Sequence, residues 1–204
     1  MNLKRRIIVN NDFYNIFQVA PPVTDADVHA AVDKLAGTQV DTLALMTDSL
    51  GGGTGGISPE LVDLYRHPEA DPCVRNLADF YKAGKDPFGM VLTRARKQGL
   101  EFLASIRMND THYKDHLYHP WVDPFYYDHL HLRVGAGGSR GGAEFDYRMS
   151  AVRDRLLNQV RRTITTYDVD GVELDMTRNC LFFPRGTDAA GHTAECAPVM
   201  TDLI

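Results

Sequence analysis

Four short apolar runs alternate with three helical patterns along the 204 residues, and this alternation limits the fold more than any other feature. The apolar runs lie near 6–10, 42–47, 101–108 and 171–176. A strand that is connected through a helix to the next strand runs parallel to it, with a right-handed crossover. The sequence therefore predicts an α/β fold whose four strands are parallel and adjacent in chain order.

Local signals mark the ends of the predicted helices. Thr24 is expected to cap the first helix and Gly37 to end it. The second helix is expected to begin at Asp86-Pro87 and to end at Gly99. The third shows apolar residues four positions apart, a stripe that is expected to face the sheet: Val152, Leu156, Val160 and Ile164.

The long connections, 49–85 and 110–146, both follow the carboxyl ends of predicted strands, whereas the returns from helix to strand are short. Elaborated loops at one end of the strands are typical of the active-site face of a barrel, although open sheets also bind ligands there. We therefore expect a single domain over 1–204, in which parallel (β/α) units form the first half of a TIM-type (β/α)₈ barrel.

Four strands make half of such a barrel, so the chain is expected to be truncated after the fourth strand, or a partner to supply the rest. A half-barrel exposes two strand edges and the apolar lining between them. We therefore expect a homo-oligomer such as a dimer, aggregation, or support from a missing segment.

Composition argues against several classes of protein. The net charge of −5, with scattered basic residues, argues against a nucleic-acid partner. No apolar stretch is long enough to span a membrane, and Ile7-Ile8-Val9 is too short for the core of a signal peptide, so the localisation stays open. The glycine run 51–56 lacks the lysine of a phosphate-binding loop and the spacing of a dinucleotide site. No cofactor and no metal are expected.

The fourth strand alternates between two kinds of side chain. Val172 and Leu174 point to one face, and Glu173 and Asp175 point to the other. In a barrel the carboxylates would face the axis, and Arg107 of the third strand is expected within ion-pair reach of them. An inward cation favours the ionised form that a nucleophile needs.

Two segments resemble a known family. The residues from Tyr167 to Arg178, which read Tyr-Asp-Val-Asp-Gly-Val-Glu-Leu-Asp-Met-Thr-Arg, resemble the fourth-strand signature of family-ten-like glycosyl hydrolases. The segment 105–112, Ser-Ile-Arg-Met-Asn-Asp-Thr-His, is similar to the end of that group's third strand. The resemblance implies a (β/α)₈ protein that hydrolyses glycosidic bonds in an oligo- or polysaccharide.

In this interpretation Asp175 is the principal catalytic carboxylate, and Glu173 is the second choice. Glycosidases use two carboxylates, and the second usually comes from a later strand, so the half-barrel is expected to be incomplete as a catalyst. Polar and aromatic residues near the strand ends are expected to bind the carbohydrate: Asn11, Asp12, Asp48, Arg107, Asn109, His112, Trp121 and Arg178.

Two other functions stay open. A barrel that binds carbohydrate without catalysis would use the aromatic residues of the 110–146 loop, which otherwise form a satellite core: Tyr113, Tyr118, Trp121, Phe125, Tyr126 and Tyr127. A metal-dependent hydrolase would use the histidines of the same loop: His112, His116, His119, His129 and His131.

Overall fold

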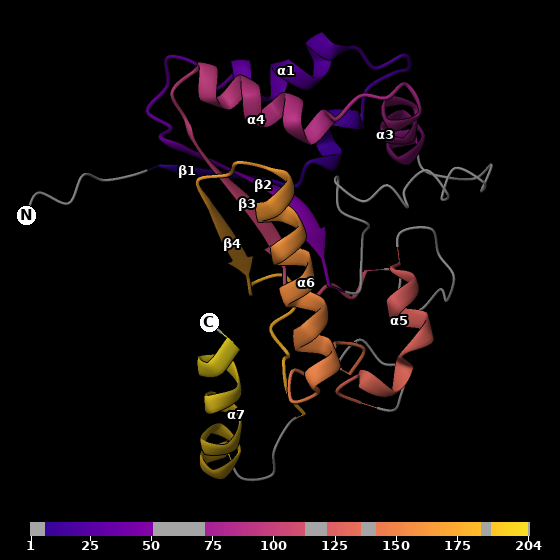
Figure 1. The fold of residues 1–204 in the computed structure, drawn as a ribbon, viewed down its shortest axis with the longest axis vertical. Coiled ribbons are helices and arrows are strands. Elements are labelled where there is room, and N and C mark those ends of the chain that lie inside the picture. Colours follow the sequence, from indigo (N-terminus) through magenta and orange to yellow (C-terminus); the bar gives the residue numbers. More distant parts are fainter. Residues whose placement is uncertain (1–6, 51–71, 113–121, 136–141, 185–188, 204) are drawn as a thin grey trace, which may run out of the picture. The chain divides into compact units, whose positions relative to one another are not determined.

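The computed structural model describes residues 7–50, 72–112, 122–135, 142–184 and 189–203 (Figure 1). The chain divides into two compact units. The first unit contains Met1–Asp48, Thr54–Ile106 and Thr163–Leu174, and the second contains Ser49–Gly53, Arg107–Arg162 and Asp175–Ile204.

Four parallel strands form one sheet in the order β1-β2-β3-β4. The strands are β1 (Ile8–Asn11), β2 (Thr42–Ser49), β3 (Glu101–Arg107) and β4 (Gly171–Asp175). Ile8 of β1 pairs with Thr42 of β2 in parallel register. The prediction of four parallel strands, adjacent in chain order, is therefore confirmed.

The predicted helices are present as α1 (Asp25–Asp33), α4 (Pro87–Lys97) and α6 (Ser150–Thr166). α1 begins with a capping box, in which Thr24 Oγ1 accepts from the Asp27 backbone N–H and the Asp27 carboxylate accepts from the Thr24 N–H. Asp86 caps α4 by accepting from the backbone N–H of Gly89 at 3.0 Å. Both predicted helix starts are confirmed. α1 and α4 lie side by side (Figure 1).

Thr24→Ala is expected to lower the free energy of unfolding by about 1 kcal/mol, because the Asp27 backbone N–H loses the hydroxyl oxygen that accepts from it. Thr24→Ser keeps the hydroxyl and serves as the matched control, with a value close to that of the wild type. Urea denaturation measures both variants. Equal stability of the alanine and serine variants would contradict a stabilising role for the capping box.

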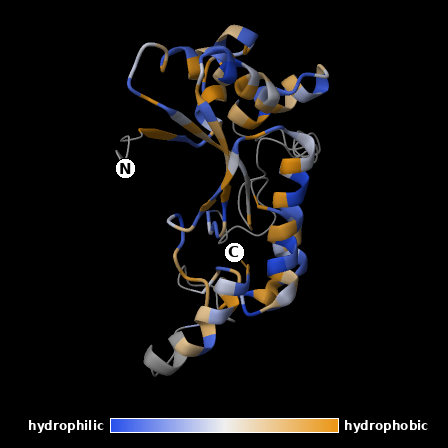
Figure 2. Cartoon of the chain, turned by 60° about the vertical axis from the view of Figure 1, so that its left-hand side comes forward, coloured by the Kyte–Doolittle hydropathy of each residue, from blue (hydrophilic) through white to orange (hydrophobic). Residues whose placement is uncertain are grey.

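The buried stripe of α6 differs from the predicted one. Val152 and Leu156 are buried as expected, but Ile164 is 52% exposed, and the buried face continues through Gln159 and Thr163. An α-helix has 3.6 residues per turn, so each step of four residues rotates the stripe by about 40°. After three such steps Ile164 has left the buried face. Polar and apolar residues alternate along the helix in Figure 2.

Three helices differ from the sequence prediction. α3 (Pro72–Lys82) and α5 (Pro124–Asp128) lie where long loops were expected. The apolar tail of the sequence predicts that a further helix starts at Pro198, and α7 (Ala189–Leu203) begins nine residues before that position. The buried apolar residues of α3 recur at helical spacing, so the signal was present in the sequence: Cys73, Val74, Leu77, Ala78 and Phe80.

An aromatic cluster identifies the helix-covered face of the sheet within the first unit. The ring of Phe88 on α4 lies 5.4 Å from that of Phe102 on β3, 4.7 Å from that of Tyr167 and 6.3 Å from that of Phe13, measured between centroids. Phe88, Phe102 and Phe13 are fully buried. Phe102 therefore points toward the helices, and its strand neighbours Glu101 and Leu103 point to the opposite face.

Within the described ranges, none of the helices combines the length and the apolar character that crossing a membrane requires.

Candidate functional site

The face of the sheet opposite Phe102, here called the inner face, can be followed across all four strands. Thr42 on β2 donates through Oγ1 to Glu101 Oε2 at 2.7 Å, so Thr42 lies on this face with Glu101. Asn10 pairs with Ala44, two residues beyond Thr42, and shares its side of the sheet. On β4, a Cβ at Gly171 would lie 3.1 Å from Leu103 Cδ2, and Glu173 follows two residues later.

A hydrogen bond joins the two edge strands across the inner face. Asn10 Nδ2 on β1 donates to Glu173 Oε2 on β4 at 2.6 Å. In a flat sheet β1 and β4 would lie about 14 Å apart, which is three strand spacings. Fully extended asparagine and glutamate side chains together reach only roughly 8 Å from their Cα atoms. With the 2.6 Å hydrogen bond added, they still do not span the separation of a flat sheet. The sheet is therefore curved, and its inner face is concave.

Four charged or titratable side chains form a chain of contacts in the second unit, here called the strand-end cluster. Arg107 Nη1 lies 3.3 Å from Asp110 Oδ2, and both side chains are almost completely buried. Asp110 Oδ1 lies 2.5 Å from His112 Nδ1 and accepts from the His112 backbone N–H at 3.0 Å. His112 Nε2 lies 3.5 Å from Arg178 Nη2. The cluster contains three of the residues predicted for the site.

The chain segments that follow β3 and β4 run side by side. The Met108 backbone N–H donates to the Asp175 carbonyl at 3.0 Å. Three residues farther on, the Thr111 backbone N–H donates to Asn179 Oδ1, also at 3.0 Å. These contacts place the end of β4, with Asp175, next to the segment that carries the strand-end cluster.

Asp175 is half-buried, and one of its carboxylate oxygens is fixed. Oδ1 accepts from the Thr177 backbone N–H at 2.9 Å and from the Thr177 hydroxyl at 2.6 Å. Within the part of the chain that the structure describes, Oδ2 has no hydrogen-bond partner. The turn therefore holds the carboxylate in one orientation and leaves one oxygen for another molecule.

The environment of Asp110 lowers its pKa below the ordinary value. Burial acts in the opposite direction and raises the pKa of this carboxyl, but hydrogen bonds from the His112 side chain and backbone, together with the charges of His112 and Arg107, outweigh it. Asp110 is therefore an anion at neutral pH.

The depressed pKa predicts a pH dependence of stability. The unfolded chain binds a proton at Asp110 near pH 3.9, whereas the folded chain binds it only at lower pH. The stabilisation by the ionised Asp110 carboxylate is complete above the pKa of the unfolded chain. It is lost as the pH falls through the pKa of the folded chain, by up to about 1.4 kcal/mol per pH unit. Urea unfolding between pH 6 and pH 2.5 should show a steeper loss in the wild type than in Asp110→Asn. Parallel curves for the two proteins would contradict the prediction.

Two asparagines predicted to bind substrate connect backbone segments in the structure. Asn109 is buried, donates to the carbonyls of Phe145 and Leu181, and accepts from the Phe145 backbone N–H. Asn11 is also buried, and its Oδ1 accepts from the Phe13 backbone N–H at 2.8 Å. These bonds give both residues a structural role, and their predicted contact with substrate stays a prediction.

The remaining predicted residues are partly described. Asp12 is exposed at the end of β1. Trp121 and the Asp48 side chain lie outside the described residues. The predicted ion pair of Arg107 with Glu173 or Asp175 stays a prediction. Sequence reasoning missed Asp110 as a site residue, although a carboxylate two positions before His112 was visible in the resembling segment.

The aromatic residues of the 110–146 loop contribute to a satellite core. Tyr126 is fully buried, donates from its hydroxyl to the Ala143 carbonyl at 3.0 Å, and packs 5.4 Å from the ring of Phe145. Phe125 stacks on His129 at 4.2 Å. These contacts give Tyr126 a packing role, whereas Tyr113, Tyr118 and Trp121 lie outside the described residues.

The histidines of the same loop belong in part to the undescribed segment, which contains His116 and His119. Among the described residues, no group of three or more histidine, cysteine or acidic side chains could hold a metal ion. His129, directly after the end of α5, has its Nδ1 2.9 Å from the Phe125 carbonyl oxygen, and this contact orients its ring.

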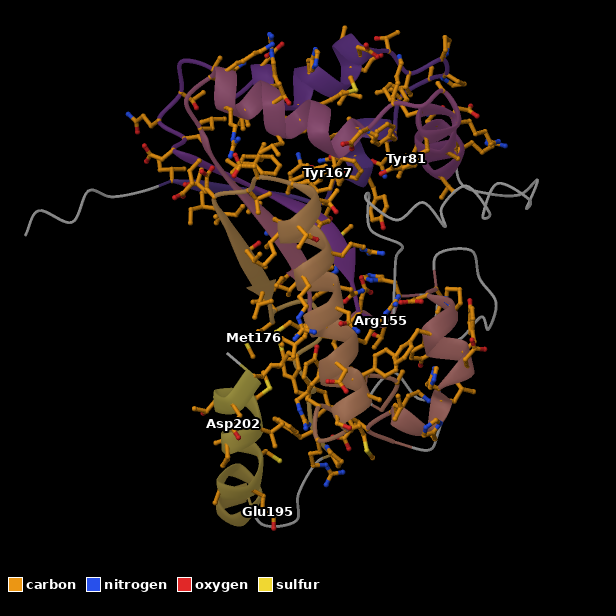
Figure 3. The ribbon with its side chains drawn as sticks, in the orientation of Figure 1. Tyr81, Arg155, Tyr167, Met176, Glu195 and Asp202 are labelled. Carbon is orange, nitrogen blue, oxygen red and sulfur yellow. The ribbon has the colours of Figure 1, made fainter. Side chains whose placement is uncertain are left out.

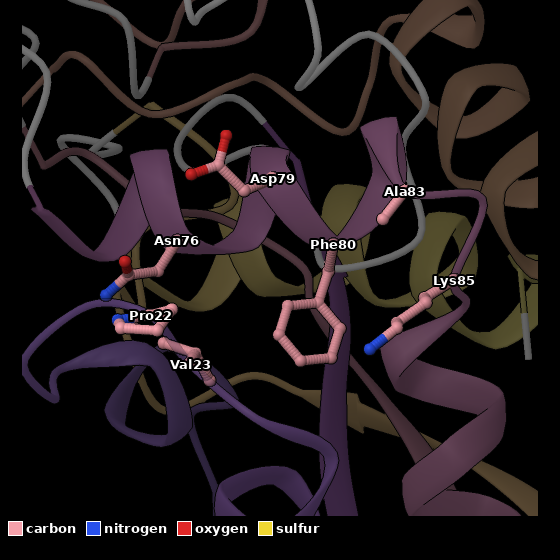
Figure 4. A pocket seen from close by; sticks show the side chains of 7 residues that line it. All are labelled: Pro22, Val23, Asn76, Asp79, Phe80, Ala83 and Lys85. Carbon is pink, nitrogen blue, oxygen red and sulfur yellow. The ribbon is translucent and has the colours of Figure 1, made fainter.

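A pocket of about 120 Å³ lies in the first unit (Figure 4). Its lining comprises Pro22, Val23, Asn76, Asp79, Phe80, Ala83 and Lys85. The Lys85 ammonium group lies 4.9 Å from the centroid of the Phe80 ring and 2.6 Å from the Asp25 carboxylate. None of the residues predicted for the site lines this pocket.

No protein-family model matches the chain, and a comparison with curated proteins finds no match.

Proposed function

We propose that the chain is a glycoside hydrolase of the (β/α)₈-barrel type, with Asp175 as its principal catalytic carboxylate. The observation that carries the proposal is the Asp175 side chain at the carboxyl end of β4. Its Oδ1 is fixed by Thr177, and its Oδ2 has no partner among the described residues. Barrel enzymes carry out their chemistry at this end of their strands.

The curvature of the sheet supports the barrel. A four-stranded parallel sheet with a concave face that carries Asn10, Thr42 and Glu173, and with helices on its other face, has the shape of the first half of a barrel. The Asn10–Glu173 bond requires that curvature. Flat or gently twisted open sheets do not bring the side chains of their first and fourth strands into contact.

The chemistry follows from the carboxylate. Asp175 Oδ2 attacks the anomeric carbon as a nucleophile, or its charge stabilises the oxocarbenium-like transition state. Glu173, two residues earlier on β4, accepts from Asn10 and is the second choice for either role. The resemblance of residues 167–178 to family-ten-like glycosyl hydrolases implies the same reaction, hydrolysis of glycosidic bonds.

The test is turnover by the purified protein. Aryl glycosides and oligosaccharides of several sugar classes are incubated with it, and released aryl alcohol and new reducing ends are measured. We expect one sugar class to be cleaved. Binding of a sugar without cleavage, detected by calorimetry, would replace the proposal with a carbohydrate-binding barrel. Neither binding nor cleavage across the series would reject it.

A further inference from the structure

The ring of His112 is held in one orientation. Asp110 Oδ1 lies 2.5 Å from Nδ1 and also accepts from the His112 backbone N–H at 3.0 Å. A carboxylate that accepts from Nδ1 fixes the ring and places the exchangeable position at Nε2. Asp110 thus orients the imidazole as the aspartate of a catalytic triad does.

The carboxylate that orients His112 is itself fixed. The Asp110 side chain is 3% exposed, and its second oxygen lies 3.3 Å from the guanidinium of Arg107, which is also buried. Asp110 therefore stays ionised and has little freedom to rotate away from the imidazole. A surface histidine–aspartate pair would lack this support, because an exposed carboxylate has water as an alternative partner.

The other side of the ring faces a replaceable partner. The His112 side chain is 51% exposed, and its Nε2 lies 3.5 Å from Nη2 of the exposed Arg178. A contact of this length is weak, and an exposed arginine can turn aside. The oxygen of a bound substrate can therefore reach Nε2.

We infer that His112 is the acid–base residue of the proposed hydrolase, with Asp110 and Arg107 as positioning residues. The inference rests on the proposed function. His112 would take the role that a second carboxylate has in most glycosidases. The segments carrying Asp175 and His112 run side by side, as the Met108–Asp175 and Thr111–Asn179 bonds show.

The proposed hydrolysis has two steps, and in each step one bond to the anomeric carbon forms as another breaks. In the first, Asp175 Oδ2 forms a bond to the anomeric carbon, the bond to the leaving oxygen breaks, and that oxygen takes the proton from His112 Nε2. In the second, a water oxygen attacks the anomeric carbon, the ester bond to Asp175 breaks, and Nε2 takes the proton of the water. The enzyme returns to its starting state.

A series of leaving groups tests the inference on the same sugar. A phenyl glycoside needs its leaving oxygen protonated, whereas a 2,4-dinitrophenyl glycoside leaves as a stable anion. We expect His112→Gln to lower kcat/KM for the phenyl glycoside by roughly 10²- to 10⁴-fold, and that for the dinitrophenyl glycoside by less than about tenfold. Asp110→Asn should show the same pattern with smaller losses, as a positioning residue would.

His131→Gln is the matched control, because His131 is an exposed histidine of the same unit and should show wild-type rates on both substrates. Circular dichroism verifies that the His112 variant folds, which its exposed side chain favours. Equal losses on the two substrates, or none, would overturn the inference while Asp175→Asn remains inactive. A wild type that cleaves neither substrate nor any other glycoside would instead reject the proposed function itself.

Discussion

Asp175→Asn is expected to lower the turnover of a glycoside by roughly 10³-fold or more while the fold remains intact. The amide is nearly the same size as the carboxylate, and its oxygen can still accept from the Thr177 backbone N–H and hydroxyl. What the variant loses is the negative charge and the nucleophilic oxygen. Because both act mainly in the transition state, kcat should fall much more than KM rises.

Asp202→Asn is the matched control for this change. Asp202 is an exposed aspartate on α7 of the same unit (Figure 3), so the substitution removes the same charge at a position outside the strand ends. Its kcat and KM should equal those of the wild type. If Asp175→Asn kept near-normal turnover, Glu173 or a loop carboxylate would have to replace Asp175 in the proposal.

Arg107→Met is expected to lower the free energy of unfolding by about 3–5 kcal/mol, the range typical of breaking a buried ion pair. Methionine fills most of the space of the arginine stem but leaves the 3%-exposed Asp110 carboxylate without its cation. The ionised Asp110 would then be compensated by His112 alone among the partners described above. Urea denaturation at neutral pH measures the change.

Arg96→Met is the comparison for this substitution. Arg96 pairs with Asp168 at 2.8 Å on an exposed surface, where solvent screens the interaction. Its loss should leave the free energy of unfolding close to that of the wild type. A similarly small effect at Arg107 would show that the buried pair contributes little, and the strand-end cluster would lose its support.

The sequence was sufficient for the order of the strands and for the starts of two helices. Apolar runs and helical spacing are local signals, and each of the four strands lies where a run was predicted. Thr24 and Asp86 cap their helices because a side-chain oxygen next to free backbone N–H groups has a partner within the same turn. Such signals need no knowledge of distant residues.

The site was less predictable, because its contacts join residues far apart in the chain. Asn109 has the same side chain whether it binds a sugar or connects two loops, and its partners Phe145 and Leu181 are fixed only by the fold. The Asn10–Glu173 bond likewise depends on the curvature of the sheet, which no single strand encodes. The alternation of side chains along β3 is a local pattern in the sequence, and it agrees with the position of Phe102, whose ring packs on Phe88 of α4.

The structure of Asp175→Asn with a bound oligosaccharide that the wild type cleaves tests the central claim most directly. The account predicts electron density for the sugar at the carboxyl ends of β3 and β4, with a glycosidic bond in contact with residue 175 and its bridging oxygen facing His112 Nε2. A sugar bound instead in the pocket beside Phe80 and Lys85, with none at residue 175, would contradict it.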